Sequence, residues 1–88
     1  MKYRKKPIIV EAEQFFVFNA KYEKEQEELN KRLGVKYDYG SSTLFSIDTL
    51  EGKHEVSNND WIVIGVKGEK YPVKPDIFEM TYEKVTKT

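Results

Sequence analysis

Cysteine is absent from this 88-residue chain, and histidine occurs only once, at position 54. The lack of cysteine excludes a disulfide framework, a thiolate nucleophile and cysteine-ligated zinc, and it is compatible with a reducing cytosol. His54 lies close to Glu51 and Glu55, but one imidazole with scattered carboxylates lacks the ligand spacing of a structural metal site. We therefore interpret His54 as an ordinary hairpin residue and predict neither a metal nor a cofactor.

Net charge and long apolar runs are also missing. Fifteen basic residues balance fifteen acidic ones, so the chain has no general attraction to nucleic acid or to an anionic membrane. The basic N-terminus is followed only by Ile8-Ile9-Val10 before Glu11, which is too short for a secretory or membrane segment. We also find no catalytic or phosphate-binding motif, and we expect a protein that is not an enzyme.

What the chain does contain is typical of a small folded domain. Hydrophobic residues make up 39% of it, which is too many for a disordered segment. Because a second domain would be too small to bury a core, we expect a single domain over residues 1–88.

Residue patterns predict an α+β fold, with a small antiparallel sheet of about five or six strands. One amphipathic helix, about 20–33, packs on the sheet, and a short helical turn lies near 75–80. β-Branched and alternating runs indicate the strands, with tight turns at Glu51-Gly52 and Lys67-Gly68. These strands are expected at 7–18, 43–50, 53–56, 61–66, 69–73 and 81–85.

The helix has recognisable ends. Asn19 can cap its first turn, and Gly34 can supply the left-handed stop. The intervening sequence predicts one buried stripe, formed by Tyr22, Gln26, Leu29 and Leu33.

The C-terminal third is the richest in structural signals. Pro72 lacks an amide donor, so the strand at 69–73 is predicted at a sheet edge. The Tyr71-Pro72 bond is either cis or trans, because an X–proline bond adopts both forms. Pro75 is typical of a first helical turn. Trp61 is expected to anchor the core, with Ile77 and Phe78 closing it.

The two ends of the chain also resemble a family of small proteins encoded by bacteriophages and prophages. The matching residues are Tyr3-Arg4-Lys5-Lys6-Pro7-Ile8-Ile9-Val10-Glu11-Ala12 and the run from Asp60 through Tyr71-Pro72-Val73-Lys74-Pro75-Asp76 to Glu83. The chain departs from that family at Asn59, where a glycine is usual, and at Val73, where a cysteine is common. The resemblance implies no enzymatic activity, and it implies the cytoplasm of a bacterial host cell as the setting.

Nine residues are candidates for binding. The basic ones would form one patch if the first strand lay beside the last hairpin, and the tyrosines combine a flat apolar face with a polar tip. The candidates are Arg4, Lys5, Lys6, Tyr37, Tyr39, Lys67, Lys70, Tyr71 and Lys74.

Three functions remain open at this point. The first is a non-enzymatic interaction protein that binds a host or phage protein. The second is a sequestering protein that holds a nucleotide-like small molecule between helix and sheet, with Arg4, Lys67 or Lys70 on its phosphate. The third is a weak nucleic-acid binder that uses the basic patch. An edge strand at 69–73 would also allow a homodimer to form by strand pairing.

Overall fold

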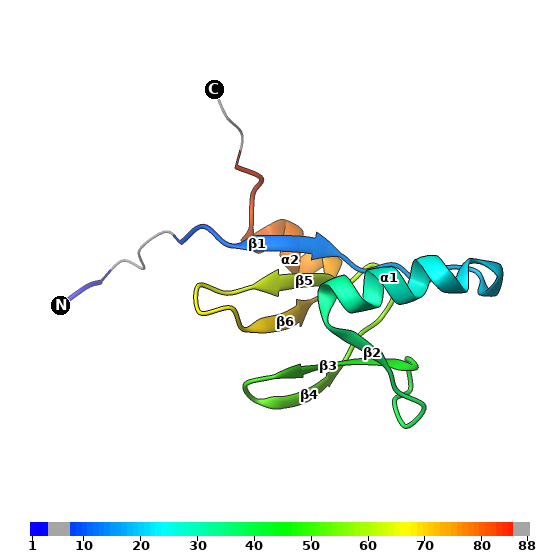
Figure 1. The fold of residues 1–88 in the computed structure, drawn as a ribbon. Helices are drawn as coiled ribbons and strands as arrows, with labels where there is room; N and C mark the ends of the chain where they lie inside the picture. Colours follow the sequence, from blue (N-terminus) through cyan, green and yellow to red (C-terminus); the bar gives the residue numbers. More distant parts are fainter. Residues whose placement is uncertain (4–7, 86–88) are drawn as a thin grey trace.

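The computed structural model describes residues 1–3 and 8–85, which form an α+β fold as predicted. The described residues form six strands, which divide into two three-stranded antiparallel sheets (Figure 1). The strand number therefore agrees with the prediction, but the strands form two sheets and not one. Alternation along a strand tells which side chains share a face, and it does not tell which strands are neighbours.

The first sheet has the order β1-β5-β6. Its strands are β1 (Glu11–Gln14), β5 (Trp61–Ile64) and β6 (Lys70–Val73). β6 is an edge strand, as Pro72 predicts. The predicted turn at Lys67-Gly68 is confirmed, because Gly68 has a φ of 82° and donates its N–H to Gly65 O at 3.0 Å.

The second sheet has the order β2-β3-β4. Its strands are β2 (Val35–Tyr37), β3 (Phe45–Thr49) and β4 (Gly52–Glu55). β2 was not predicted, because no strand was expected between the helix and residue 43. The predicted final strand at 81–85 is wrong, because Thr81 completes α2 and residues 82–85 form neither helix nor strand.

The helical segment at 20–33 is confirmed in position and in both ends. A 3-10 turn, η1 (Ala20–Tyr22), leads into α1 (Glu23–Leu33). The Asn19 side chain accepts from the backbone N–H of Lys21, and Gly34 ends the helix at a φ of 79°. The buried face holds Gln26, Leu29, Asn30 and Leu33. Tyr22, which we had placed on that face, is 45% exposed.

The first strand is much shorter than predicted. Ile8 and Ile9 are exposed, and the strand ends at Gln14 instead of Phe18. Beyond it, Phe16 O accepts from the Gln26 side-chain amide at 3.0 Å, and Phe18 N–H donates to that amide's oxygen at 2.7 Å. The side chain of Gln26 thus takes the place of a neighbouring strand for the backbone groups of Phe16 and Phe18.

One hydrophobic core joins α1 to both sheets. Phe15 is completely buried and meets the ring of Phe45 edge-to-face, with the ring centroids 5.1 Å apart. Burial of such a side chain contributes about 1.5–3 kcal/mol to stability. The core consists of Phe15, Leu29, Leu33, Val35, Phe45, Ile47, Val56 and Ile62.

The opposite face of β1-β5-β6 is covered by α2 (Pro75–Thr81). Trp61 stacks on Phe78 with centroids 4.2 Å apart, and Phe78 stacks on Tyr82 at 4.9 Å. Trp61 and Phe78 are only half-buried and lie outside the buried core, so the prediction that they anchor and close the core is wrong, and they pack instead on this second face. Ile77 does not close the core as expected, because it is 53% exposed. No helix among residues 1–3 and 8–85 is both long and apolar enough to cross a membrane.

Candidate functional site

The three predicted lysines within the described part of the chain do not form one patch. Lys67 lies in the β5–β6 turn, whereas Lys74 follows the far end of β6, just before α2. Lys70 starts β6 between them. Arg4, Lys5 and Lys6 lie outside the described residues.

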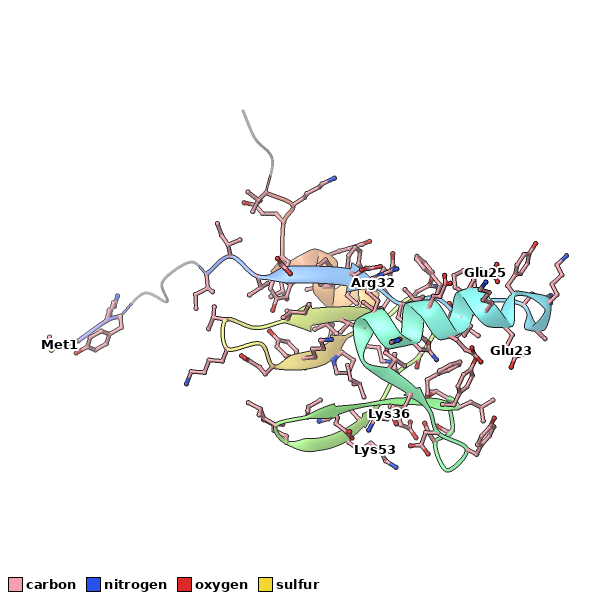
Figure 2. The ribbon with its side chains drawn as sticks, viewed as in Figure 1. Met1, Glu23, Glu25, Arg32, Lys36 and Lys53 are labelled. Carbon is pink, nitrogen blue, oxygen red and sulfur yellow. The ribbon has the colours of Figure 1, made fainter. Side chains whose placement is uncertain are left out.

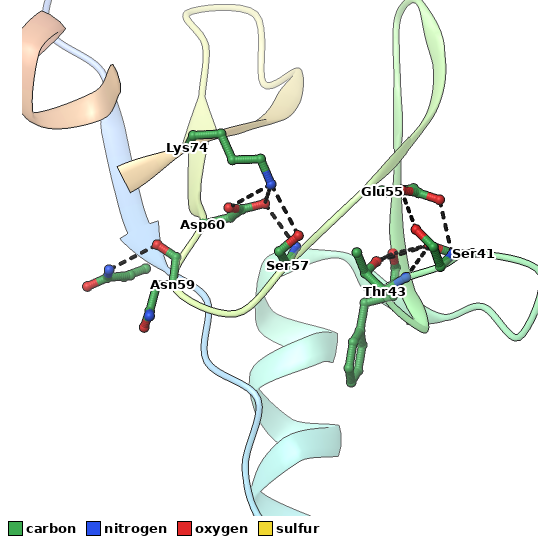
Figure 3. Close-up of polar contacts among 10 residues, drawn as sticks. Ser41, Thr43, Glu55, Ser57, Asn59, Asp60 and Lys74 are labelled. Atoms are coloured by element: carbon green, nitrogen blue, oxygen red, sulfur yellow. Dashed lines mark hydrogen bonds and ion pairs between the residues drawn. The ribbon is translucent and has the colours of Figure 1, made fainter. Parts of the chain in front are cut away.

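Lys74 takes part in a structural ion pair (Figure 3). Its ammonium lies 3.1 Å from Asp60 Oδ2 and donates to the hydroxyl of Ser57 at 3.1 Å. The Asp60 side chain is only 2% exposed and also accepts from the backbone N–H of Ser57. Asp60 thus closes the turn before β5, and Lys74 compensates its buried charge.

Lys70 is directed towards the C-terminal end of α1. Its ammonium is 3.5 Å from Arg32 O, and its chain passes close to Gly34. A positive charge at this place interacts favourably with the partial negative charge of the helix end. The structure thus gives Lys70 a local structural role.

Tyr71 is half-buried and shares a hydrogen bond with the hydroxyl of Tyr82, at 3.2 Å. This bond, followed by burial, raises the pKa of Tyr71 to about 12. The Tyr71-Pro72 peptide bond is trans. Tyr71 therefore helps to fix the C-terminal segment, and it is less accessible than an edge tyrosine was expected to be.

Tyr37 and Tyr39, in contrast, are open to solvent. Tyr37 ends β2 with 43% of its surface exposed, and its ring rests on Phe45 at a centroid distance of 5.2 Å. Tyr39 is 85% exposed in the following loop, and Leu44 of the same loop is 51% exposed. We call Tyr37, Tyr39 and Leu44 the aromatic surface.

The loop that carries this surface is held in a defined shape. Asp38 N–H donates to Leu44 O at 2.8 Å, which closes the loop at its base. Inside it, the hydroxyls of Ser41 and Thr43 both donate to Phe45 O (Figure 3). The surface therefore belongs to an ordered loop with its ends pinned together.

Leu44 has an unusual backbone conformation, with a φ of 66°. A left-handed leucine costs about 1–2 kcal/mol relative to glycine, because its Cβ crowds the next carbonyl group. Its side chain is nevertheless exposed and contributes nothing to the core. An exposed apolar side chain kept at a conformational cost is a feature of functional surfaces.

Two carboxylates border the aromatic surface. Arg32 pairs with Glu13 of β1, which identifies the flank of α1 that faces the first sheet. Helical spacing of about 100° per residue places Glu23 and Glu27 on the other flank, towards β2. Burial raises the pKa of Tyr37 and the two negative charges raise it further. In Figure 2, Glu23 lies below α1, on the side of the β2–β3 loop, and Glu25 lies above it.

A second candidate site is an open cleft between the two sheets. It has a volume of about 390 Å³. The β3–β4 hairpin contributes Thr49, Leu50, Glu51 and His54, and β6 with the residue before it contributes Glu69, Lys70, Tyr71 and Pro72. Both signs of charge line the cleft. Among the described residues, no cluster of three or more histidine and acidic side chains is arranged to hold a metal ion.

The outer edge of β6 offers few groups for strand pairing. Gly65 N–H donates to Glu69 O, so the alternation of an antiparallel ladder directs the backbone groups of Lys70 and Pro72 away from β5. Pro72 has no N–H to offer, which leaves Lys70 as the outward donor within the strand. Homodimer formation through this edge stays a prediction, and the proline weakens it.

No protein-family model, no curated protein and no solved structure matches this chain. Its site must therefore be interpreted from its own geometry. Of the predicted residues that the structure describes, Tyr37 and Tyr39 are both exposed and lie two positions apart, at the end of β2 and in the loop that follows it. Sequence analysis missed Leu44, Glu23 and Glu27, because a left-handed backbone and the facing of a helix flank leave no signal in a single sequence.

Proposed function

We propose that this chain is a non-enzymatic interaction protein that binds a protein partner through the aromatic surface. The observation that carries the proposal is the exposure of Tyr37 at the end of β2 and of Tyr39 and Leu44 on the pinned loop that follows it, with exposed fractions of 43%, 85% and 51%. Tyrosine is enriched at protein interfaces and among the few residues that carry most of the binding energy. A fixed loop also loses little conformational entropy on binding.

A phage or prophage origin fits this proposal. The N-terminal and C-terminal runs resemble small proteins that phages encode, and this resemblance implies no enzymatic activity. The partner would then be a host or phage protein in the cytoplasm of a bacterial cell.

The experiment is a crosslinking pull-down from nuclease-treated lysate of a candidate bacterial host, with retained proteins identified by mass spectrometry. The test variant is Tyr39→Ser. The matched control is Leu50→Ser, because Leu50 is also 85% exposed but follows the opposite end of β3 from Leu44. We expect one stoichiometric partner with the unmodified protein and with Leu50→Ser, and its loss with Tyr39→Ser. Retention by Tyr39→Ser, or equal loss from both variants, would contradict the proposal.

A small-molecule function is the second candidate, favoured by the cleft between the sheets. The cleft lies beside β6 and not between helix and sheet as expected, although Lys70 and His54 both line it. A nucleotide that binds there, at a free concentration 100 times its Kd, would stabilise the folded state by about 2.7 kcal/mol. An unchanged melting temperature across a nucleotide panel near millimolar concentration would exclude this function.

A nucleic-acid function has less support from the described residues. Lys70 and Lys74 are engaged in structural contacts, and Lys67 lies apart from Lys74. If the protein bound an oligonucleotide through its phosphates, the affinity would fall steeply as the salt concentration increases, because phosphate contacts release counterions. A flat salt response would remove this candidate.

A further inference from the structure

Around the aromatic surface, the basic side chains have ion-pair partners and two acidic side chains have none among the described residues. The lysines of the neighbouring sheet are already paired, Lys36 with Asp48 at 2.6 Å and Lys53 with Asp38 at 2.8 Å. Glu23 and Glu27 form no ion pair within the described part of the chain. An exposed apolar surface is thus bordered by two negative charges that have no ion-pair partner among residues 1–3 and 8–85.

The carboxylates of Glu23 and Glu27 determine which side chains of a partner protein would bind favourably here. Glu23 and Glu27 lie on the flank of α1 that faces β2 and act electrostatically on the hydroxyl of Tyr37, so a basic side chain that reaches either carboxylate would lie near Tyr37. An arginine satisfies both neighbours, because its guanidinium pairs with a carboxylate in a bidentate fork and also stacks on an aromatic face. Lysine offers only a point charge, and an acidic side chain would be repelled.

The exposed leucine adds a second requirement. Leu44 lies at the base of the same loop, where Asp38 N–H binds its carbonyl oxygen. An apolar residue next to the arginine would cover Leu44 and exclude water from the charged contact. Exclusion of water strengthens such a contact.

We infer that the aromatic surface binds a segment of the partner protein in which an arginine lies beside an apolar residue, with the arginine between Tyr37 and the carboxylates of Glu23 and Glu27. This inference rests on the proposed function, and it specifies the partner's chemistry. It concerns the aromatic surface alone and does not involve the cleft between the sheets.

The test uses the full chain and three fluorescein-labelled 12-residue peptides, measured by fluorescence anisotropy at low salt. Each peptide is made of glycine and serine with two copies of a dipeptide, which is arginine–leucine, lysine–leucine or glutamate–leucine. We expect the arginine peptide to bind most tightly and the glutamate peptide to bind least. If all three peptides bound with the same affinity, or if none of them bound, the inference would be overturned.

Charge-matched variants test the position of the contact. Glu23→Gln with Glu27→Gln should raise the Kd of the arginine peptide about 2- to 30-fold, the effect of losing two exposed ion pairs. The control, Glu25→Gln with Glu28→Gln, removes the same charge from other parts of the same helix and should leave the Kd unchanged. An equal effect of both pairs would show general attraction between opposite charges and would refute the assigned position.

A further variant addresses the apolar contact without risk to the fold. Leu44→Asn keeps a residue that accepts the left-handed backbone, so the protein should stay folded while the Kd of the arginine peptide rises. An unchanged Kd would refute the role of Leu44. If the pull-down partner depends on Tyr39 but the peptides show no preference for arginine, the inference fails and the proposed function stands. If the partner is retained by Tyr39→Ser, the proposed function itself fails.

Discussion

The ion pair between Lys74 and Asp60 leads to a prediction that separates structure from ligand binding. Asp60 is almost fully buried, whereas 56% of the Lys74 side chain is exposed. Replacing Lys74 by methionine leaves a buried carboxylate with the Ser57 N–H as its remaining partner. Replacing Asp60 by asparagine keeps an oxygen for that N–H and lets the lysine move into water. The two substitutions should therefore have very different effects on the free energy of unfolding.

The magnitudes follow from what each change leaves unpaired. Loss of one partner of a fully buried pair costs about 3–5 kcal/mol. Because Lys74 is half-exposed, water replaces part of its contact, and we expect about 2 kcal/mol for Lys74→Met. Asp60→Asn should cost about 1 kcal/mol, since a hydrogen bond to a neutral acceptor contributes less than one to a charge. The double variant should be more stable than Lys74→Met alone, by about 1 kcal/mol, because it no longer buries a charge.

Urea unfolding followed by the fluorescence of Trp61, the only tryptophan, measures all three variants. In a chain of this size, 1 kcal/mol shifts the melting temperature by about 4–8 °C, so thermal unfolding gives an independent check. A double variant as unstable as the sum of the two single variants would refute the reasoning. The same result would mean that Lys74 is not needed to compensate the charge of Asp60 and is available to bind a ligand.

Three further predictions concern single residues. Gly34→Ala should destabilise the protein by about 1 kcal/mol, because its φ of 79° is left-handed, and circular-dichroism melting would show it. The pKa of Tyr71 is raised to about 12. Its contribution to stability is therefore fully present below pH 10 and is lost as pH rises towards 12. Tyrosine ionisation followed by absorbance at alkaline pH, compared with the Tyr71→Phe variant, tests this. Two bonds from Ser42 lower the pKa of Glu55, so stability should fall as pH decreases below the usual glutamate range, and Glu55→Gln should weaken that dependence in acid unfolding.

Local signals in the sequence predicted those parts of the fold that depend on local chemistry. The helix end at Gly34, the start of α2 at Pro75 and the edge position of Pro72 each follow from the backbone properties of one residue. Such properties act within a few residues, so a single sequence is enough to infer them.

The features that sequence analysis missed depend on distant neighbours. β2 is extended because Val35 and Tyr37 pair with Ile47 and Phe45 of β3. The three residues of β2 contain no local pattern that predicts this pairing. The alternation at 81–85 suggested a strand, but Tyr82 N–H donates to Phe78 O and completes the helix end. The site follows the same rule, since its tyrosines could be identified as exposed contacts while its acidic border required the folded chain.

The two faces of the β1-β5-β6 sheet differ in how firmly they are covered. No residue of α2 is buried, and the helix rests on Trp61 through stacked rings. Elements with so little buried surface open by local fluctuation well before the whole protein unfolds. We expect amides of α2 to exchange with deuterium sooner than those of β5, and a protease to cleave near the tail first. We therefore expect Val63, which is completely buried in the docked form, to become exposed on the back of an otherwise intact sheet whenever the C-terminal helix undocks.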